Sequence, residues 1–212
     1  MSSVLLIFLK YPEPGKVKTR LAATLGAGPA AAVYCRLVAE VCAQLPKTVP
    51  WVVMFDPVER EAEIIEWMRG VADNRPLLFW SQGQGDLGAR LSRAFARAFD
   101  AGFTRVAVIG SDCVELGPAH FEETWRALEP GTVVIGPCED GGYYLLALCA
   151  PCGELFVGIE WSSERVLAQT LGKARQAGLK AHLLAALPDV DQAEDWLRAQ
   201  IFLANRAHSP LC

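Results

Sequence analysis

A cluster of cationic side chains lies just after the first apolar segment of the chain. Lys16, Lys18 and Arg20 follow Gly15 within five residues. The apolar residues 4–9 predict a buried strand before this loop, and the Ala-rich segment after it predicts a helix. Cations and the free amides at a helix N-terminus attract anions, most simply a phosphate, and Gly15 lets the backbone approach such a ligand closely. The alternative is a solvated positive turn, and the spacing does not match a P-loop.

Two carboxylates follow predicted strands further along the chain. Asp112 comes just after the apolar run at residues 106–109, and Asp191 comes after the last predicted strand. The carboxyl ends of parallel strands form the edge at which open α/β sheets bind ligands. If both strands belong to one sheet, the two carboxylates can meet there and suit Mg²⁺ or Mn²⁺, which also take phosphate oxygens as ligands. The alternatives are that Asp112 only caps a turn, and that Asp189 or Asp191 caps the final helix.

The segment Glu139-Asp-Gly-Gly-Tyr143 is a further candidate for ligand contact. Gly141 and Gly142 permit a tight turn and close backbone contact with a ligand. Asp140 could bind a sugar hydroxyl or a metal-bound water, but an ordinary hairpin would show the same pattern.

A match to the dinucleotide fingerprint GxGxxG at Gly83–Gly88 offers a function of a different class. The match follows a predicted strand and precedes a predicted helix, and Asp112 lies near the spacing at which that fold places its ribose-binding acid. This alternative is a dinucleotide-binding oxidoreductase. Asp86 argues against it, because its carboxylate would repel a pyrophosphate. Cys149 and Cys152 form a CxxC, but no second CxxC or pair of histidines completes a zinc set.

The composition limits the function classes further. The chain has 212 residues, 52% of them hydrophobic, and a formal charge of −4. This composition excludes a disordered chain and gives no general attraction to nucleic acid or to an anionic membrane. The first apolar run is too short to span a membrane. Seven cysteines, scattered through apolar segments, are expected to be mostly reduced thiols, and we expect a cytoplasmic protein. The Trp and Phe residues could serve either the core or a homodimer face.

Predicted strands and helices alternate almost throughout. We expect strands at 4–9, 51–55, 77–80, 106–109, 132–135, 143–149 and 181–184, and helices at 21–45 (broken near 26–28), 57–69, 87–99, 118–128, 162–177 and 192–205. This order predicts one three-layer α/β/α domain over residues 1–212, with a mostly parallel sheet.

Several motifs resemble, in order, those of a family of small bacterial transferases associated with radical-SAM and selenium-related genes, formerly a domain of unknown function. They are residues 10–21, 84–88, 110–113, 136–137 with 140–144, 161–163 and 189–191. The resemblance implies a glycosyltransferase-A-like fold of the nucleotide-diphospho-sugar transferase superfamily. The sequence departs from the family pattern at Val114, where the family usually has Pro, and at Gln192, where it usually has Thr.

The resemblance also implies roles for individual residues. The nucleotide and its phosphates would contact Pro14, Gly15, Lys16, Lys18, Arg20, Gly85 and Asp86. The catalytic residues would be Lys18, Arg20 and Asp112. A Mg²⁺ or Mn²⁺ ion would bind Asp112 and Asp191, and Asp140, Gly141 and Gly142 would face the sugar or acceptor.

These inferences together predict a metal-dependent transferase that uses a nucleotide-sugar donor and an unknown acceptor. The first alternative is a nucleotidyltransferase that joins a nucleoside triphosphate to a phosphorylated small molecule. The expected partner is a nucleotide or nucleotide-sugar substrate, and no nucleic acid partner is expected.

Overall fold

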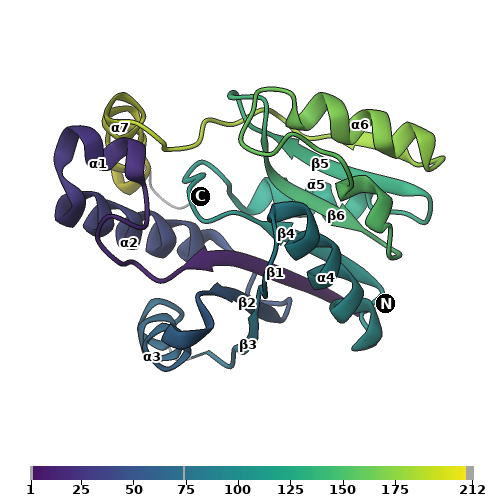
Figure 1. Ribbon diagram of the computed structural model, residues 1–212, viewed down its shortest axis with the longest axis horizontal. Helices are drawn as coiled ribbons and strands as arrows, with labels where there is room; N and C mark the ends of the chain where they lie inside the picture. Colours follow the sequence, from purple (N-terminus) through teal and green to yellow (C-terminus); the bar gives the residue numbers. More distant parts are fainter. Residues whose placement is uncertain (1, 74, 209–212) are drawn as a thin grey trace.

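One seven-stranded sheet forms the centre of the structure, a computed structural model that describes residues 2–73 and 75–208 (Figure 1). The strands described there are β1 (Ser3–Lys10), β2 (Trp51–Asp56), β3 (Leu78–Ser81), β4 (Arg105–Ile109), β5 (Thr132–Pro137), β6 (Tyr143–Leu148) and β7 (Lys180–Leu183). Their order across the sheet is β3-β2-β1-β4-β6-β5-β7. All neighbouring pairs are parallel except those of β6, which is antiparallel to β4 and to β5.

Helices cover both faces of the sheet, as the alternating pattern predicts. On one face lie α2 (Ala27–Gln44), α3 (Glu61–Val71), which follows the short 3-10 turn η1 (Val58–Arg60), and α5 (Pro118–Ala127). On the other lie α4 (Leu87–Asp100), the 3-10 turn η2 (Gly153–Phe156) and α6 (Val166–Gln176). The central strand β1 is buried between them. Leu5 and Ile7 point into the first layer, and Val4 and Leu6 point into the second. The predicted α/β class and three layers are therefore confirmed.

The remaining two helices pack outside α2. The short helix α1 (Thr19–Leu25) and the last helix α7 (Ala193–His208) share a third apolar cluster with α2. Val114, which stands where the family pattern usually has Pro, is buried in this cluster and contributes an apolar contact to it. None of the helices in residues 2–73 and 75–208 is long and apolar enough to cross a membrane.

The strand order reverses direction beside β1. From β1 the chain builds β2 and β3 on one side, and it then returns to place β4 on the other side. The carboxyl ends of β1 and β4 therefore flank a topological switch point, where the loops that leave two adjacent parallel strands diverge and leave a crevice.

The long segment after β7 crosses back over the sheet edge to reach α7 (Figure 1). Leu187 forms a bridge with Cys138, and the Val190 amide then donates to the Asp112 carbonyl at 3.2 Å. Asp191 thus approaches Asp112 because the chain returns across the sheet. The strands β4 and β7 belong to one sheet, as expected, but β6 and β5 lie between them, so the approach depends on this returning segment.

The expected helix start at Ser162 is wrong. Ser162 has a left-handed backbone (φ 64°), and α6 begins only at Val166. Neither Ser162 nor Ser163 provides a side-chain cap to the first turn of the helix, although the Ser163 hydroxyl accepts a hydrogen bond from the Arg165 amide at 3.3 Å. Residues 160–164 instead form a turn that lies against the crevice.

Candidate active site

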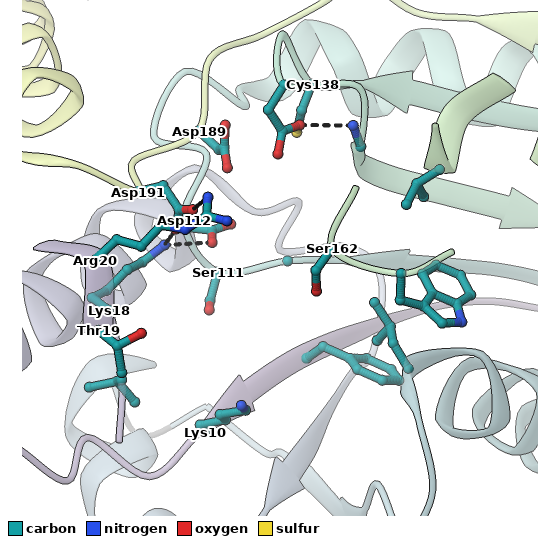
Figure 2. A pocket seen from close by; sticks show the side chains of 18 of the residues that line it. Lys10, Lys18, Thr19, Arg20, Ser111, Asp112, Cys138, Ser162, Asp189 and Asp191 are labelled. Atoms are coloured by element: carbon teal, nitrogen blue, oxygen red, sulfur yellow. Dashed lines mark hydrogen bonds and ion pairs between the residues drawn. The ribbon is translucent and has the colours of Figure 1, made fainter. Parts of the chain in front are cut away.

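A cavity of about 730 Å³ opens at the carboxyl ends of β1 and β4 (Figure 2). Leu9 and Lys10 reach it from β1, and Ser111 and Asp112 reach it from the end of β4. Across from these, residues of the β5–β6 hairpin and of the 160–164 turn complete the wall. The position is the one that the topology of the sheet predicts for a ligand site.

Lys18 is the most buried charged side chain of the basic loop. Its side chain is only 6% exposed, and its Nζ lies 2.8 Å from Asp112 Oδ2 and 3.5 Å from Asp191 Oδ1. Burial by itself would lower the pKa of the ammonium, but the charges of the two carboxylates and the hydrogen bond from Lys18 to Asp112 raise it above its ordinary value. Lys18 therefore stays charged and draws the two carboxylates together.

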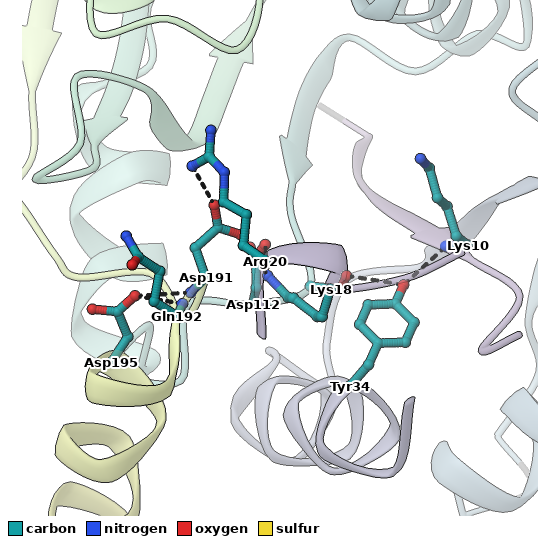
Figure 3. A network of polar contacts seen from close by, with 9 residues as sticks. Lys10, Lys18, Arg20, Tyr34, Asp112, Asp191, Gln192 and Asp195 are labelled. Atoms are coloured by element: carbon teal, nitrogen blue, oxygen red, sulfur yellow. Dashed lines mark hydrogen bonds and ion pairs between the residues drawn. The ribbon is translucent and has the colours of Figure 1, made fainter. Parts of the chain in front are cut away.

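Arg20 pairs with Asp191 from the solvent side. Its guanidinium lies 3.0 Å from Asp191 Oδ2, and its own side chain is 65% exposed (Figure 3). The Asp195 carboxylate holds the backbone of Asp191, because it accepts hydrogen bonds from the amides of Asp191 at 3.1 Å and Gln192 at 2.8 Å. Asp195 thus caps the start of α7. The side chain of Asp191 remains directed at the cations.

The end of β1 is fixed by a buried tyrosine. The Tyr34 hydroxyl accepts from the Lys10 amide at 2.9 Å and lies 3.4 Å from the Ser111 hydroxyl (Figure 3). Burial raises the pKa of Tyr34 to about 12, so the phenol stays protonated and can donate to Ser111. Tyr34 therefore ties together the two strand ends that carry the cationic loop and Asp112.

A second group of potential metal ligands lies on the same cavity and was not expected as a group. One ligand atom from each of Cys138, Asp140 and Asp189 lies within 4.8 Å of the other two. Burial and the negative charges of Asp112 and Asp140 raise the pKa of Asp189 to about 6. Asp140 alone among these three was a sequence candidate. The other two are brought together by the Cys138–Leu187 bridge, which no local pattern in the sequence indicates.

The predicted hairpin turn at residues 139–142 is confirmed, and it joins β5 to β6. The Asp140 carboxylate accepts from the Gly142 amide at 2.8 Å, and both residues line the cavity. Gly141 is not among the described residues that line the cavity, and a Cβ there would lie 2.2 Å from the Glu164 carbonyl oxygen. Gly141 is therefore needed for the close approach of the hairpin to the 160–164 turn, which explains this glycine without a ligand.

The GxGxxG segment has structural explanations of the same kind. The Asp86 carboxylate accepts from the Ala89 amide at 2.8 Å and caps α4. A Cβ on Gly83 would lie 2.7 Å from the Arg93 guanidinium, which donates to the carbonyls of Gln82 and Gln84. The segment follows β3 at the edge of the sheet, and of its neighbourhood Gln82 and Leu87 line the cavity whereas Gly83, Gly85 and Gly88 do not.

The structure thus separates the candidates into two sets. Lys16, Lys18, Arg20, Asp112, Asp140, Gly142 and Asp191 line the cavity. Pro14, Gly15, Gly85, Asp86 and Gly141 lie outside the set of described residues that line it. The helix α1 that follows the basic loop has only seven residues, and Lys18 is its N-cap residue. Cys149 and Cys152 are free thiols and lie away from the cavity.

The donor set of Asp112 and Asp191 fits a hard divalent ion. One ammonium nitrogen already contacts both carboxylates, so their oxygens converge on a single cation position. Among the described residues that line the cavity, five side chains are acidic and four are cationic: Asp112, Asp140, Glu164, Asp189 and Asp191 against Lys10, Lys16, Lys18 and Arg20. The lining therefore carries one more acidic side chain than cationic side chains.

Comparison with known proteins identifies the family. Residues 39–163 match a family described as uncharacterized proteins conserved in bacteria (DUF2064). The chain belongs to this family. A crystal structure from Desulfovibrio desulfuricans G20, which carries the provisional name nucleotide-diphospho-sugar transferase, is 33% identical with a TM-score of 0.83. The match covers 99% of this chain and 90% of that one. No curated protein matches the sequence. The expected association with radical-SAM and selenium-related genes stays a prediction.

More distant structures share the fold of this DUF2064 chain. A CMP:2-keto-3-deoxy-manno-octonic acid synthetase in complex with CTP matches with a TM-score of 0.55 and 13% identity, over 97% of this chain and all of that one. A Mycobacterium tuberculosis H37Rv protein in complex with manganese matches with a TM-score of 0.51 and 13% identity, over 93% and 97% of the two chains. The neighbours whose names state an activity are nucleotidyl or sugar-nucleotide transferases, and the nucleotide-diphospho-sugar transferase fold is confirmed.

Proposed function

We propose that this DUF2064 protein is a metal-dependent transferase that uses a nucleotide-sugar donor and passes the glycosyl group to an acceptor. The observation that carries the proposal is the convergence of Lys18, Asp112 and Asp191 at the switch point between β1 and β4. A fold shared with nucleotide-using transferases and a manganese-bound structure of that fold support it.

The metal would be held by Asp112 and Asp191. A bound Mg²⁺ or Mn²⁺ would supply electrostatic stabilisation of the departing nucleoside diphosphate. Lys16, Lys18 and Arg20 lie on the same loop and would add positive charge to those phosphates as the glycosidic bond breaks.

The opposite side of the cavity would hold the sugar and the acceptor. Asp140, Asp189 and Glu164 present carboxylates there that can accept from sugar or acceptor hydroxyls. Asp189 lies beside Asp140 on this side of the cavity, and its carboxylate can accept a proton. We propose that Asp189 accepts the proton of the attacking hydroxyl.

The charge balance of the cavity favours a nucleotide sugar over a nucleoside triphosphate. The second phosphate of a nucleotide sugar is esterified, so this donor carries fewer negative charges than a triphosphate. A lining with more acidic than basic groups therefore accommodates it with less added metal charge.

Nucleotidyl transfer is the second candidate, because the synthetase that shares the fold binds CTP. In that reaction the same cations would stabilise the α-phosphoryl group of a nucleoside triphosphate and the departing pyrophosphate.

Thermal shift measurements test the class of substrate. UDP-glucose, GDP-mannose, CTP and GTP are each added with and without Mn²⁺, and we expect stabilisation by at least one of them only when Mn²⁺ is present. No shift with any of the four would contradict the transferase assignment. A shift with NADH that needs no metal would favour the dinucleotide-binding oxidoreductase instead.

Product analysis then separates the two transfer reactions. Release of UDP or GDP from a nucleotide sugar, accelerated by an acceptor, is the outcome we expect. Release of pyrophosphate from CTP or GTP in the presence of a phosphorylated sugar would establish nucleotidyl transfer in its place.

A further inference from the structure

The Lys18 ammonium occupies the point at which the two carboxylates of the proposed metal site converge. It lies 2.8 Å from Asp112 and 3.5 Å from Asp191, and only 6% of the side chain is exposed (Figure 3). A divalent ion ligated by the same two carboxylates would lie close to this nitrogen. Two cations at such a short separation repel one another strongly, and solvent screens the Lys18 ammonium little because only 6% of its side chain is exposed.

We propose that Lys18 is an internal cation that keeps the divalent ion out of the site until the phosphates of a nucleotide draw the ammonium away. This inference rests on the proposed function, and it concerns the order in which that site is filled. In the absence of a nucleotide, Lys18 neutralises Asp112 and Asp191 and holds them in position. When phosphates arrive, the ammonium gains new anionic partners and the carboxylates become available to the metal.

The loop that carries Lys18 is suited to such an exchange. The side chain of lysine is long, so its ammonium can reorient without movement of the main chain. The backbone of Lys18 is left-handed (φ 45°), a conformation that costs free energy in a residue other than Gly and that clusters at ligand-binding segments. Lys16 and Arg20 flank it and line the same cavity, so phosphates bound there would come within reach of Lys18.

Arg20 does not duplicate this role. Its guanidinium contacts Asp191 alone, from the outside, and 65% of the side chain is exposed. Solvent screens an ion pair of this kind and leaves it weak. Among the described cations of the cavity, Lys18 is thus the one that bridges both carboxylates.

A thermodynamic consequence follows for metal and nucleotide. The metal and the nucleotide each displace Lys18 from Asp112 and Asp191. Whichever ligand binds first bears the free-energy cost of this displacement, and the other then binds without it. Metal and nucleotide must therefore strengthen one another's binding by the same factor. In the free protein the metal affinity is low because Lys18 competes for the carboxylates.

Binding of Mn²⁺ to the protein without nucleotide tests the inference directly. Isothermal titration calorimetry or the paramagnetic resonance signal of free Mn²⁺ gives the dissociation constant for wild type, Lys18→Met and Lys16→Met. The Lys16 variant loses the same charge from the same loop but leaves the bridging ammonium in place. We expect Lys18→Met to bind Mn²⁺ about tenfold or more tightly than wild type, and Lys16→Met to change the affinity by much less.

A second variant guards against a folding defect. Lys18→Gly also removes the ammonium, and glycine adopts the left-handed backbone without strain. Circular dichroism checks that each variant is folded, and Asp112→Asn in the Lys18→Met background should abolish the added Mn²⁺ affinity. Equal or weaker Mn²⁺ binding by both Lys18 variants would overturn the inference, and so would a gain of the same size in Lys16→Met.

Titration with UDP-glucose distinguishes failure of this inference from failure of the proposed function. The Mn²⁺ measurements need no nucleotide, so they stand even if UDP-glucose does not bind. If UDP-glucose binds, we expect Mn²⁺ to increase its affinity by a larger factor in wild type than in Lys18→Met. An equal factor in the two proteins would contradict a role of Lys18 in the coupling.

Discussion

The two walls of the cavity are held by different kinds of contact. The charged wall (Lys18, Arg20, Asp112 and Asp191) depends on ion pairs between side chains far apart in the sequence. The hairpin wall (residues 138–142 and 160–166) depends on backbone contacts. The Cys138 amide donates to the Gly142 carbonyl at 3.0 Å, and the Leu167 amide donates to the Gly141 carbonyl at 2.8 Å.

This difference indicates how each wall responds to a ligand. Ion pairs can be exchanged for contacts to a bound metal or phosphate, because the same side chains offer equivalent charges to either partner. Backbone hydrogen bonds and close packing offer no such exchange, so the hairpin wall should keep its shape. We therefore expect changes in the charged wall to alter ligand response and changes in the hairpin wall to alter stability.

The largest effect is expected from Asp112→Asn. Loss of this carboxylate should abolish the Mn²⁺-dependent thermal shift with nucleotide and lower turnover by about 10²–10³-fold, the loss typical when one electrostatic contact is removed from a transition state. Each shift is measured against the melting temperature of the same variant without ligand. Asp100→Asn, an exposed acid at the end of α4, is the control. A metal-dependent shift that survives in Asp112→Asn would show that the metal assignment is wrong.

Gly141→Ala tests the hairpin wall. The added Cβ would lie 2.2 Å from the Glu164 carbonyl oxygen, and the backbone of Gly141 is left-handed (φ 90°). Strain and overpacking together should lower the free energy of unfolding by about 3 kcal/mol or more, measured by urea denaturation.

Gly131→Ala is the matched control for that measurement. Gly131 also has a left-handed backbone (φ 80°), but a Cβ there meets no atom within 4 Å. The Gly131→Ala substitution should lower the free energy of unfolding by about 1 kcal/mol, from backbone strain alone. Equal losses in the two variants would show that the contact with the 160–164 turn contributes nothing.

The meeting of Lys18 and Asp112 could be predicted from the sequence, because each residue follows a recognisable buried strand. Lys18 and Asp112 each follow a buried strand, and β1 and β4 pair directly in parallel register. Asp191 was predicted to join them, and it does, but through the chain that returns after β7 and the bond from Val190 to Asp112. Contacts of that kind depend on a long connection whose path no local pattern specifies.

The hairpin wall was predicted less well, because its geometry also depends on contacts between distant segments of the chain. The turn at residues 139–142 was recognisable from its glycines, but the antiparallel position of β6 between β4 and β5 was not. A helix was expected to start at Ser162, and serine favours the position just before a helix. The left-handed backbone of Ser162, which places the 160–164 turn beside Gly141, overrides that local preference. The grouping of Cys138 with Asp189 was likewise set by tertiary contacts.

Tyr34→Phe should affect the charged wall by a smaller amount. The variant removes the hydroxyl that accepts from the Lys10 amide and contacts Ser111, without changing the buried ring. We expect a loss of about 1 kcal/mol in the free energy of unfolding. Tyr11→Phe, whose ring lies 5.0 Å from the Arg60 guanidinium, is the control. If the two variants lose the same stability, the Tyr34 hydroxyl does not tie the strand ends together.

The smallest effect is expected from Asp195→Ala, and it depends on pH. Burial alone would raise the pKa of Asp195, but the amides of Gln192 and Asp191 and the Arg198 guanidinium lower it below its ordinary value of 3.8. A lowered pKa in the folded state means that the carboxylate stabilises the protein above pH 3.8, and that this contribution is lost as the pH falls through the lower folded value. Urea denaturation of wild type and Asp195→Ala should therefore differ at pH 7 and converge as the pH is lowered below 3.8. Glu194→Ala, an exposed acid in the same turn of α7, should show no such convergence. The Asp195 variant could instead show the same loss in free energy of unfolding at low pH as at pH 7. The ionised carboxylate would then not be what holds the Asp191 backbone, and packing would fix that part of the charged wall.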